Sequence, residues 1–144
     1  MTGTITYDDE DDDPEIIGLT AIAEYNFGGG KAKIRYKEYP EHDTNKDTDD
    51  YILNLITINS NDKITLAKSS KNGISSILLL EKDARHTCVY NTPFGSFVMG
   101  IFTTSLIIEA SENECRISAL YTTDIEKENV RHHKLEISVK EKTA

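Results

Sequence analysis

The sequence has few cysteines and no long apolar segment. It contains 144 residues, of which two are cysteine and three are proline. No stretch approaches the roughly 18 uninterrupted apolar residues that a membrane-spanning helix needs, so we expect no contact with a membrane. Cys88 and Cys115 lie far apart without a paired-spacing motif, which predicts two small buried thiols rather than a disulfide or a metal clip.

The first residues lack the pattern of a secretory signal. Met1–Thr4 carry no positive side chain, and no apolar core segment precedes the acids that begin at Asp8. We therefore expect a cytoplasmic protein, in which a reducing environment keeps both cysteines as thiols.

Basic residues are also scarce. Lysine and arginine number 16 against 25 aspartates and glutamates, which gives a formal net charge of −9. Because phosphate binding depends on clustered basic side chains, this balance excludes nucleic acid as a partner. The acids concentrate in the six consecutive acidic residues at 8–13 and in the segment 41–50. We predict both as acidic loops, and the rest of the chain is close to neutral.

The usual motifs of catalysis and cofactor binding are missing. There is no Gly-x-Ser-x-Gly nucleophile elbow. Gly28–Gly30 joins two predicted strands and opens no helix whose N-terminus could hold a phosphate. Asp43–Asp47 begins like a calcium loop, but Thr48 and Asn54 stand where such a loop needs Gly and Glu. We therefore predict no catalytic residue, no metal and no cofactor, and an enzyme of unknown reaction is the least favoured alternative.

Apolar and polar residues alternate along most of the chain, and no window has the spacing of an amphipathic helix. The odd positions of 17–27 are all apolar, whereas every even position except Ile22 is glycine or polar. Gly28–Gly30 supplies the conformational freedom for a tight reversal into 31–39, and Asn72-Gly73 is a second hairpin signal. The predicted strands are 4–7, 17–27, 31–39, 51–58, 63–70, 74–80, 85–92, 96–110, 115–125 and 131–140.

This pattern predicts a single all-β domain over residues 1–144. The segment 96–110 is too long for one straight strand in a domain of this size, so we expect a bulge or corner at Gly100. Strands that bend in this way are typical of barrels, and we favour an antiparallel up-and-down β-barrel of about 8–10 strands over a sandwich. In such a meander the acidic loops at 8–13 and 41–50 emerge at the same end.

One segment is similar to the signature stretch of the YwiB-like bacterial proteins, a family of unknown function. It is the run Arg85–Gly95, which contains a Tyr-x-Thr-Pro-aromatic-Gly core and is followed by Phe97–Ile101. Matching pieces at Ile34–Glu38 and Lys134–Ile137 extend the resemblance over most of the chain. The resemblance implies a bacterial protein with a calycin-like, that is lipocalin-like, β-barrel, and it implies no activity. The core at Thr92–Gly95 also fits a type I turn, so folding explains it as well as function does.

Polar and aromatic residues on the predicted inner faces form the best candidate pocket. His86, Cys88 and Tyr90 share one strand face, but a metal site would need a third ligand that the sequence does not supply. The alternative is that these residues belong to the core and find hydrogen-bond partners near its rim. The candidate ligand-binding residues are Tyr25, Tyr36, Glu38, His86, Tyr90 and Tyr121.

Two functions remain open at this point. The first is a non-enzymatic intracellular barrel that binds a small, partly apolar, neutral or cationic ligand in its interior, the acidic mouth favouring a cation. The second is a filled barrel that acts through protein–protein contacts, with a homodimer as one form of such contact.

Overall fold

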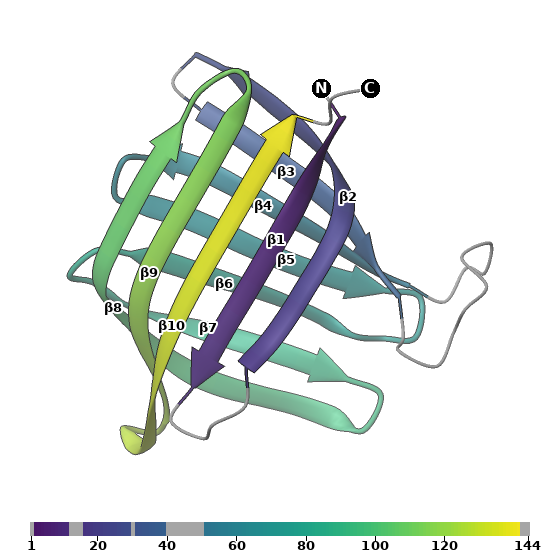
Figure 1. The fold of residues 1–144 in the computed structure, drawn as a ribbon. Coiled ribbons are helices and arrows are strands. Elements are labelled where there is room, and N and C mark those ends of the chain that lie inside the picture. Colours follow the sequence, from purple (N-terminus) through teal and green to yellow (C-terminus); the bar gives the residue numbers. More distant parts are fainter. Residues whose placement is uncertain (1, 12–15, 30, 40–50, 142–144) are drawn as a thin grey trace.

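The computed structural model describes the backbone of residues 2–11, 16–29, 31–39 and 51–141, and the side chains from Ala21 onward within these ranges. Within them the chain forms ten strands and no helix, as Figure 1 shows. The strands are β1 (Thr2–Asp11), β2 (Ile16–Gly28), β3 (Lys31–Glu38), β4 (Ile52–Ser60), β5 (Lys63–Ser70), β6 (Ser75–Glu81), β7 (Arg85–Thr92), β8 (Gly95–Ala110), β9 (Glu114–Ile125) and β10 (Glu128–Glu141).

The strands form an antiparallel up-and-down barrel. Each strand pairs with its neighbours in sequence, and β1 pairs with β10 through nine residue pairs that close the ring. The two termini therefore lie side by side (Figure 1). The expected all-β, calycin-like barrel is confirmed, with ten strands at the upper end of the predicted range.

Alternation along the strands builds the core. In β3, Ala32, Ile34 and Tyr36 are buried, while the basic residues between them are exposed. The same pattern in β9 buries Cys115 and Ile117. Each fully buried aliphatic side chain contributes roughly 1.5–3 kcal/mol relative to an exposed one, so a core of many such residues fixes which strand face points inward.

The irregularity in β8 lies four residues away from the position that the sequence suggested. The register between β8 and β9 shifts between Thr103 and Ser105, so that Thr104 is the extra residue of a bulge. Before the bulge Ile101 is buried, and after it Leu106 is buried, which means that the inward face changes from odd to even positions. The prediction of a bulge or corner at Gly100 is wrong, because Gly100 sits in regular ladder and has a different role, described below.

The acidic segments also depart from expectation. The run 8–13 was expected to be a loop, but β1 continues to Asp11, where backbone pairing with β10 outweighs the low strand propensity of acidic residues. Residues 12–13 and the whole segment 41–50 lie outside the described residues.

Candidate functional site

Three of the predicted site residues are part of the buried core. The Tyr25 hydroxyl donates a hydrogen bond to the Ser111 carbonyl oxygen at 2.7 Å, and burial raises the pKa of Tyr25 to about 12. Burial also raises the pKa of Tyr36, with the nearby Glu38 carboxylate acting in the same direction. The ring of Tyr121 stacks on His133 with centroids 4.7 Å apart. These positions agree with the alternative that the tyrosines are core residues, and the hydroxyl of Tyr25 has a hydrogen-bond partner.

The other three predicted residues are partly exposed and do not gather around one point. Glu38 lies 3.9 Å from the Lys68 ammonium, and the His86 Nε2 atom lies 2.8 Å from a Glu81 carboxylate oxygen. Tyr90 pairs with Ser76 across β6 and β7. Tyr36 and Tyr90 occupy the same inner cross-strand row, which runs through β4, β5 and β6.

The ladder between β6 and β7 is unusually short. It consists of two residue pairs, Ser75 with Asn91 and Ser76 with Tyr90, although three residues join the strands. From Ile77 towards the connecting turn, the two strands separate. His86 and Glu81 contact each other through their side chains where ladder pairs would otherwise stand.

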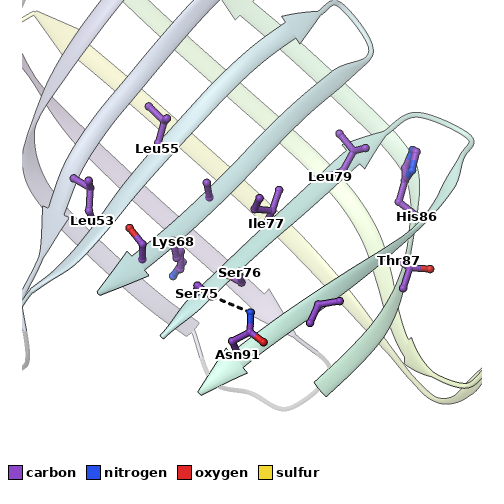
Figure 2. A pocket seen from close by; sticks show the side chains of 13 residues that line it. Leu53, Leu55, Lys68, Ser75, Ser76, Ile77, Leu79, His86, Thr87 and Asn91 are labelled. Atoms are coloured by element: carbon purple, nitrogen blue, oxygen red, sulfur yellow. Dashed lines mark hydrogen bonds between the residues drawn. The ribbon is translucent and has the colours of Figure 1, made fainter. Parts of the chain in front are cut away.

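An open groove of about 670 Å³ lies over β4, β5, β6 and β7. By register most of its lining residues belong to the outer face of the barrel, whereas Lys68, Ser76 and His86 belong to the inner face beside the opening between β6 and β7. Figure 2 shows it from close by, with leucines of β4 on one side and β7 on the other. Six of its thirteen lining residues are aliphatic: Leu53, Leu55, Ala67, Ile77, Leu79 and Val89. The polar lining residues are Lys68, Ser69, Ser75, Ser76, His86, Thr87 and Asn91.

Hydrogen bonds order the polar end of the groove. The Asn91 side-chain amide donates to the Ser75 hydroxyl at 2.9 Å, and the Ser96 hydroxyl donates to the side-chain Oδ1 atom of Asn91 at 2.6 Å. The dashed line in Figure 2 marks the first of these bonds. This end therefore presents hydroxyl and amide groups held in place beside an aliphatic floor.

The groove belongs to a wider surface without charge, which we call the uncharged face. The strand registers arrange the outer side chains of β4 to β8 in three cross-strand rows, continued across the opening between Ile77 and Val89. The central, apolar row is Leu55, Ala67, Ile77, Val89 and Val98. The hydroxyl row beside it is Leu53, Ser69, Ser75, Asn91 and Ser96, and the threonine row on its other side is Thr57, Thr65, Leu79, Thr87 and Gly100.

At one corner of this face, Gly100 makes room for a charged group that overlies the face, the partly exposed Arg85 guanidinium, which pairs with the buried Asp124. Arg85 donates two hydrogen bonds to Asp124, of 2.7 and 2.9 Å, and its guanidinium passes directly over Gly100. A Cβ atom at Gly100 would collide with this guanidinium and would lie 2.8 Å from an Asp124 carboxylate oxygen. The pair lowers the pKa of Asp124, chiefly through the hydrogen bonds from Arg85.

The segment that carried the sequence resemblance borders the groove. It supplies His86, Val89 and Asn91 to the lining and Arg85 to the ion pair. Its Thr-Pro-Phe-Gly core forms the turn between β7 and β8, where Phe94 is 98% exposed. The expected turn is thus present, and the residues that line the groove precede it.

The groove was not predicted from the sequence, because no motif of catalytic or metal-binding residues points to it. One signal was available: Ile77–Leu80 are four consecutive apolar residues, so β6 is apolar on both faces, as β4 is at Leu53 and Leu55. The core buries only one face of such a strand. The apolar side chains of the second face must therefore pack against something else or form a binding surface.

No group of three His, Cys, Asp or Glu side chains able to hold a metal ion occurs in the part of the chain whose side chains are described. The same part contains no helix long and apolar enough to cross a membrane. The groove offers apolar contact and hydrogen bonds.

Comparisons with known proteins agree with this architecture. The crystal structure of the ywiB protein from Bacillus subtilis matches with a TM-score of 0.77 and 18% identity, over 99% of this chain and 91% of that one, which shows the shared fold. No curated protein matches the chain. The family described as domain of unknown function (DUF1934) matches residues 1–137, and the chain therefore belongs to this family.

Proposed function

We propose that this protein is a non-enzymatic binding barrel whose outer groove over β4 to β7 takes a small, partly apolar ligand. The carrying observation is the groove itself, because its volume of about 670 Å³ falls within the roughly 300–1,000 Å³ typical of small-molecule sites. The aliphatic floor would bury the apolar part of the ligand, and the ordered Ser75 and Asn91 side chains would bind its polar part.

The lining favours an uncharged ligand over a cation. It includes no carboxylate, and its one ammonium, that of Lys68, faces Glu38 at 3.9 Å. His86 likewise has a carboxylate neighbour in Glu81. The ligand would therefore meet apolar surface, hydroxyls and an amide. The inner positions of Tyr25 and Tyr36 are occupied by core packing, which is why we place the ligand outside the barrel.

Binding of Nile red, an uncharged and partly apolar dye, tests this proposal. We expect a saturable rise in dye fluorescence that Ile77→Glu weakens at least tenfold, since a carboxylate would stand on the groove floor. Ile22→Glu is the matched control, because Ile22 is 61% exposed on β2 and Ile77 is 63% exposed on β6. Equal effects of the two substitutions, or no saturable binding, would contradict the proposal.

Methyl NMR locates the bound dye independently. Shifts confined to Ile77, Leu79 and Val89 support the groove. Shifts at Ile34 and other interior methyls, with none in the groove, would instead place the ligand inside the barrel.

A further inference from the structure

We propose that a second copy of this chain docks on the uncharged face, related to the first by a two-fold axis that runs along β6 through Ile77. This inference concerns a wider surface than the groove and does not depend on the proposed ligand, which would compete with the second copy for the groove at Ile77. It rests on the distribution of charge, on the self-complementary order of the three rows and on the charges at the two edges of the face.

The three rows of the uncharged face contain no charged residue, although 28% of the chain is charged. Charged outer positions begin beyond them on the same strands, at Lys63, Glu81 and Arg85. On β3 and β10 the outer positions are rich in charge, as in the exposed lysines and Arg35 of β3 and the exposed Lys134, Glu136 and Lys140 of β10. A partner for the uncharged face must itself lack charge there, since burying an unpaired charge is costly.

The uncharged face is also where exposed apolar side chains adjoin one another. In the apolar row Ile77 is 63% exposed, Val98 56% and Val89 48%. Such a contiguous patch on a folded chain usually marks an interaction surface. Isologous dimers pair one patch with itself, which requires self-complementarity.

The rows meet that requirement. A two-fold rotation about an axis along β6 places β4 opposite β8 and β5 opposite β7, and it places each row opposite itself. In the apolar row Ile77 then meets Ile77 of the partner, while the small Ala67 faces Val89 and Leu55 faces Val98. In the hydroxyl row Ser75 meets Ser75 of the partner and Ser69 faces Asn91, so these groups can donate and accept hydrogen bonds, while Leu53 faces Ser96.

The edges of the face carry opposite charges. On β3, Lys33, Arg35 and Lys37 pair with Thr57, Leu55 and Leu53, which end the three rows on one side. On the other side Gly100 pairs with Asp124, and β9 continues beyond it into the turn with the exposed Glu126 and Glu128, which flank Lys127. The same rotation brings the basic edge of each copy against the acidic edge of its partner. Complementary charges at a rim favour association and fix its orientation.

Sedimentation velocity of the full chain tests the proposal. We expect a species of twice the mass of one chain at concentrations on the order of 50 µM, in the weak range for an interface of modest size. Val98→Glu should reduce the dimer population at least tenfold, and Ile22→Glu should leave it unchanged. Circular dichroism confirms that both variants fold. A monomeric parent chain, or a Val98→Glu variant that stays dimeric, would overturn the proposal.

Cross-linking tests the position of the axis. In an Ile77→Cys variant the two introduced thiols face each other across packed sheets about 10 Å apart, so a short bismaleimide should join them within minutes. Ile22→Cys is the matched control and should not cross-link, and the native cysteines are buried. Absence of the Ile77→Cys cross-link would overturn this geometry. Val98 does not line the groove, so Val98→Glu should spare Nile red binding, and failure of the dimer is thereby distinguished from failure of the ligand proposal.

Discussion

Gly100 and Arg85 show how one absent side chain organises a corner of the barrel. The guanidinium of Arg85 crosses the outer face of β8 where Gly100 has no Cβ, and reaches Asp124 on β9. Asp124 also accepts a hydrogen bond from the backbone N–H of Lys127, which holds the turn between β9 and β10. One carboxylate therefore links β7 to β9 and to the turn between β9 and β10.

We predict that Gly100→Ala lowers the free energy of unfolding by about 1–3 kcal/mol, the usual cost of overpacking. The added methyl must displace the guanidinium or part the strands. Urea unfolding measures the change. Gly28→Ala is the control, since a Cβ at Gly28 meets nothing within 4 Å, and its effect should stay within about 0.5 kcal/mol. Equal losses for both variants would contradict this role of Gly100.

The ion pair also predicts a pH dependence. Hydrogen bonds from Arg85 lower the pKa of Asp124, so the folded state holds this carboxyl in its charged form more strongly than the unfolded state does. The stabilisation is complete above the ordinary aspartate pKa of about 3.9 and is lost as the pH falls through the lower folded value. Asp124→Asn should thus be less stable than the parent at pH 7 and converge with it in acid.

Urea midpoints between pH 2 and 7 check this expectation. Glu136→Gln is the control, because Glu136 and Lys134 form an exposed pair 3.5 Å apart, and exposed pairs contribute little. A gap between parent and Asp124→Asn that stays constant in acid would rule out the ion pair as its cause.

Among the elements, the two-pair ladder between β6 and β7 is the weakest contact between successive strands. Neighbouring strands elsewhere pair over much longer stretches, as β9 and β10 do. Cys88 lies on β7 beside this opening, and Cys115 lies on β9 between two long ladders. Burial raises the pKa of both thiols, that of Cys115 to about 11, so neither reacts readily while the structure is closed.

We predict that a disulfide reagent labels Cys88 at least tenfold faster than Cys115 in the native protein. Separation of β6 from β7 requires the loss of few hydrogen bonds and exposes Cys88 by local opening. Exposure of Cys115 requires a larger unfolding event. Mass spectrometry of Cys88→Ala and Cys115→Ala variants assigns each rate. Equal labelling rates for Cys88 and Cys115, both limited by global unfolding, would contradict a weak contact between β6 and β7.

Most strands could be predicted from the alternation of apolar and polar residues. The exceptions depend on contacts between side chains that are distant in sequence, which a local pattern does not show. Strand β3 and the hairpin at Asn72-Gly73 follow from local pattern, since Gly73 adopts a positive φ of 91° in the turn. The bulge at Thr104 has no local signal, and the need for glycine at Gly100 arises from Arg85, fifteen residues earlier.

The site was less predictable than the fold for a related reason. The inner tyrosines stood out in the sequence because they are large and polar, yet Tyr25 and Tyr121 serve the core. The uncharged face exists only once the registers of five strands align Leu55 with Ala67 and Ile77. Such an alignment is a property of the assembled sheet, and no single strand displays it.

At the scale of the whole molecule, pairing of β1 with β10 brings the chain ends together. We predict that a circular permutant, with Glu141 joined to Thr2 by a short Gly-Ser linker and new ends between Phe94 and Gly95, keeps the fold and the cooperative unfolding of the parent. Phe94 lies in an exposed turn, so the new ends interrupt no ladder. Opening the chain at Ile117 within β9 should abolish folding. Loss of structure in both permutants would contradict the tolerance of this turn.

The closure between β1 and β10 has a consequence for synthesis in the cell. At about 5–20 residues per second, β1 leaves the ribosome on the order of ten seconds before its partner β10 is complete. Until then one long edge of β1 has no strand to bind, and the aliphatic interior of the unfinished ring is open to water. Nascent chains of this barrel should therefore depend on chaperones most strongly just before termination, and truncated products that end before β10 should be the ones that aggregate.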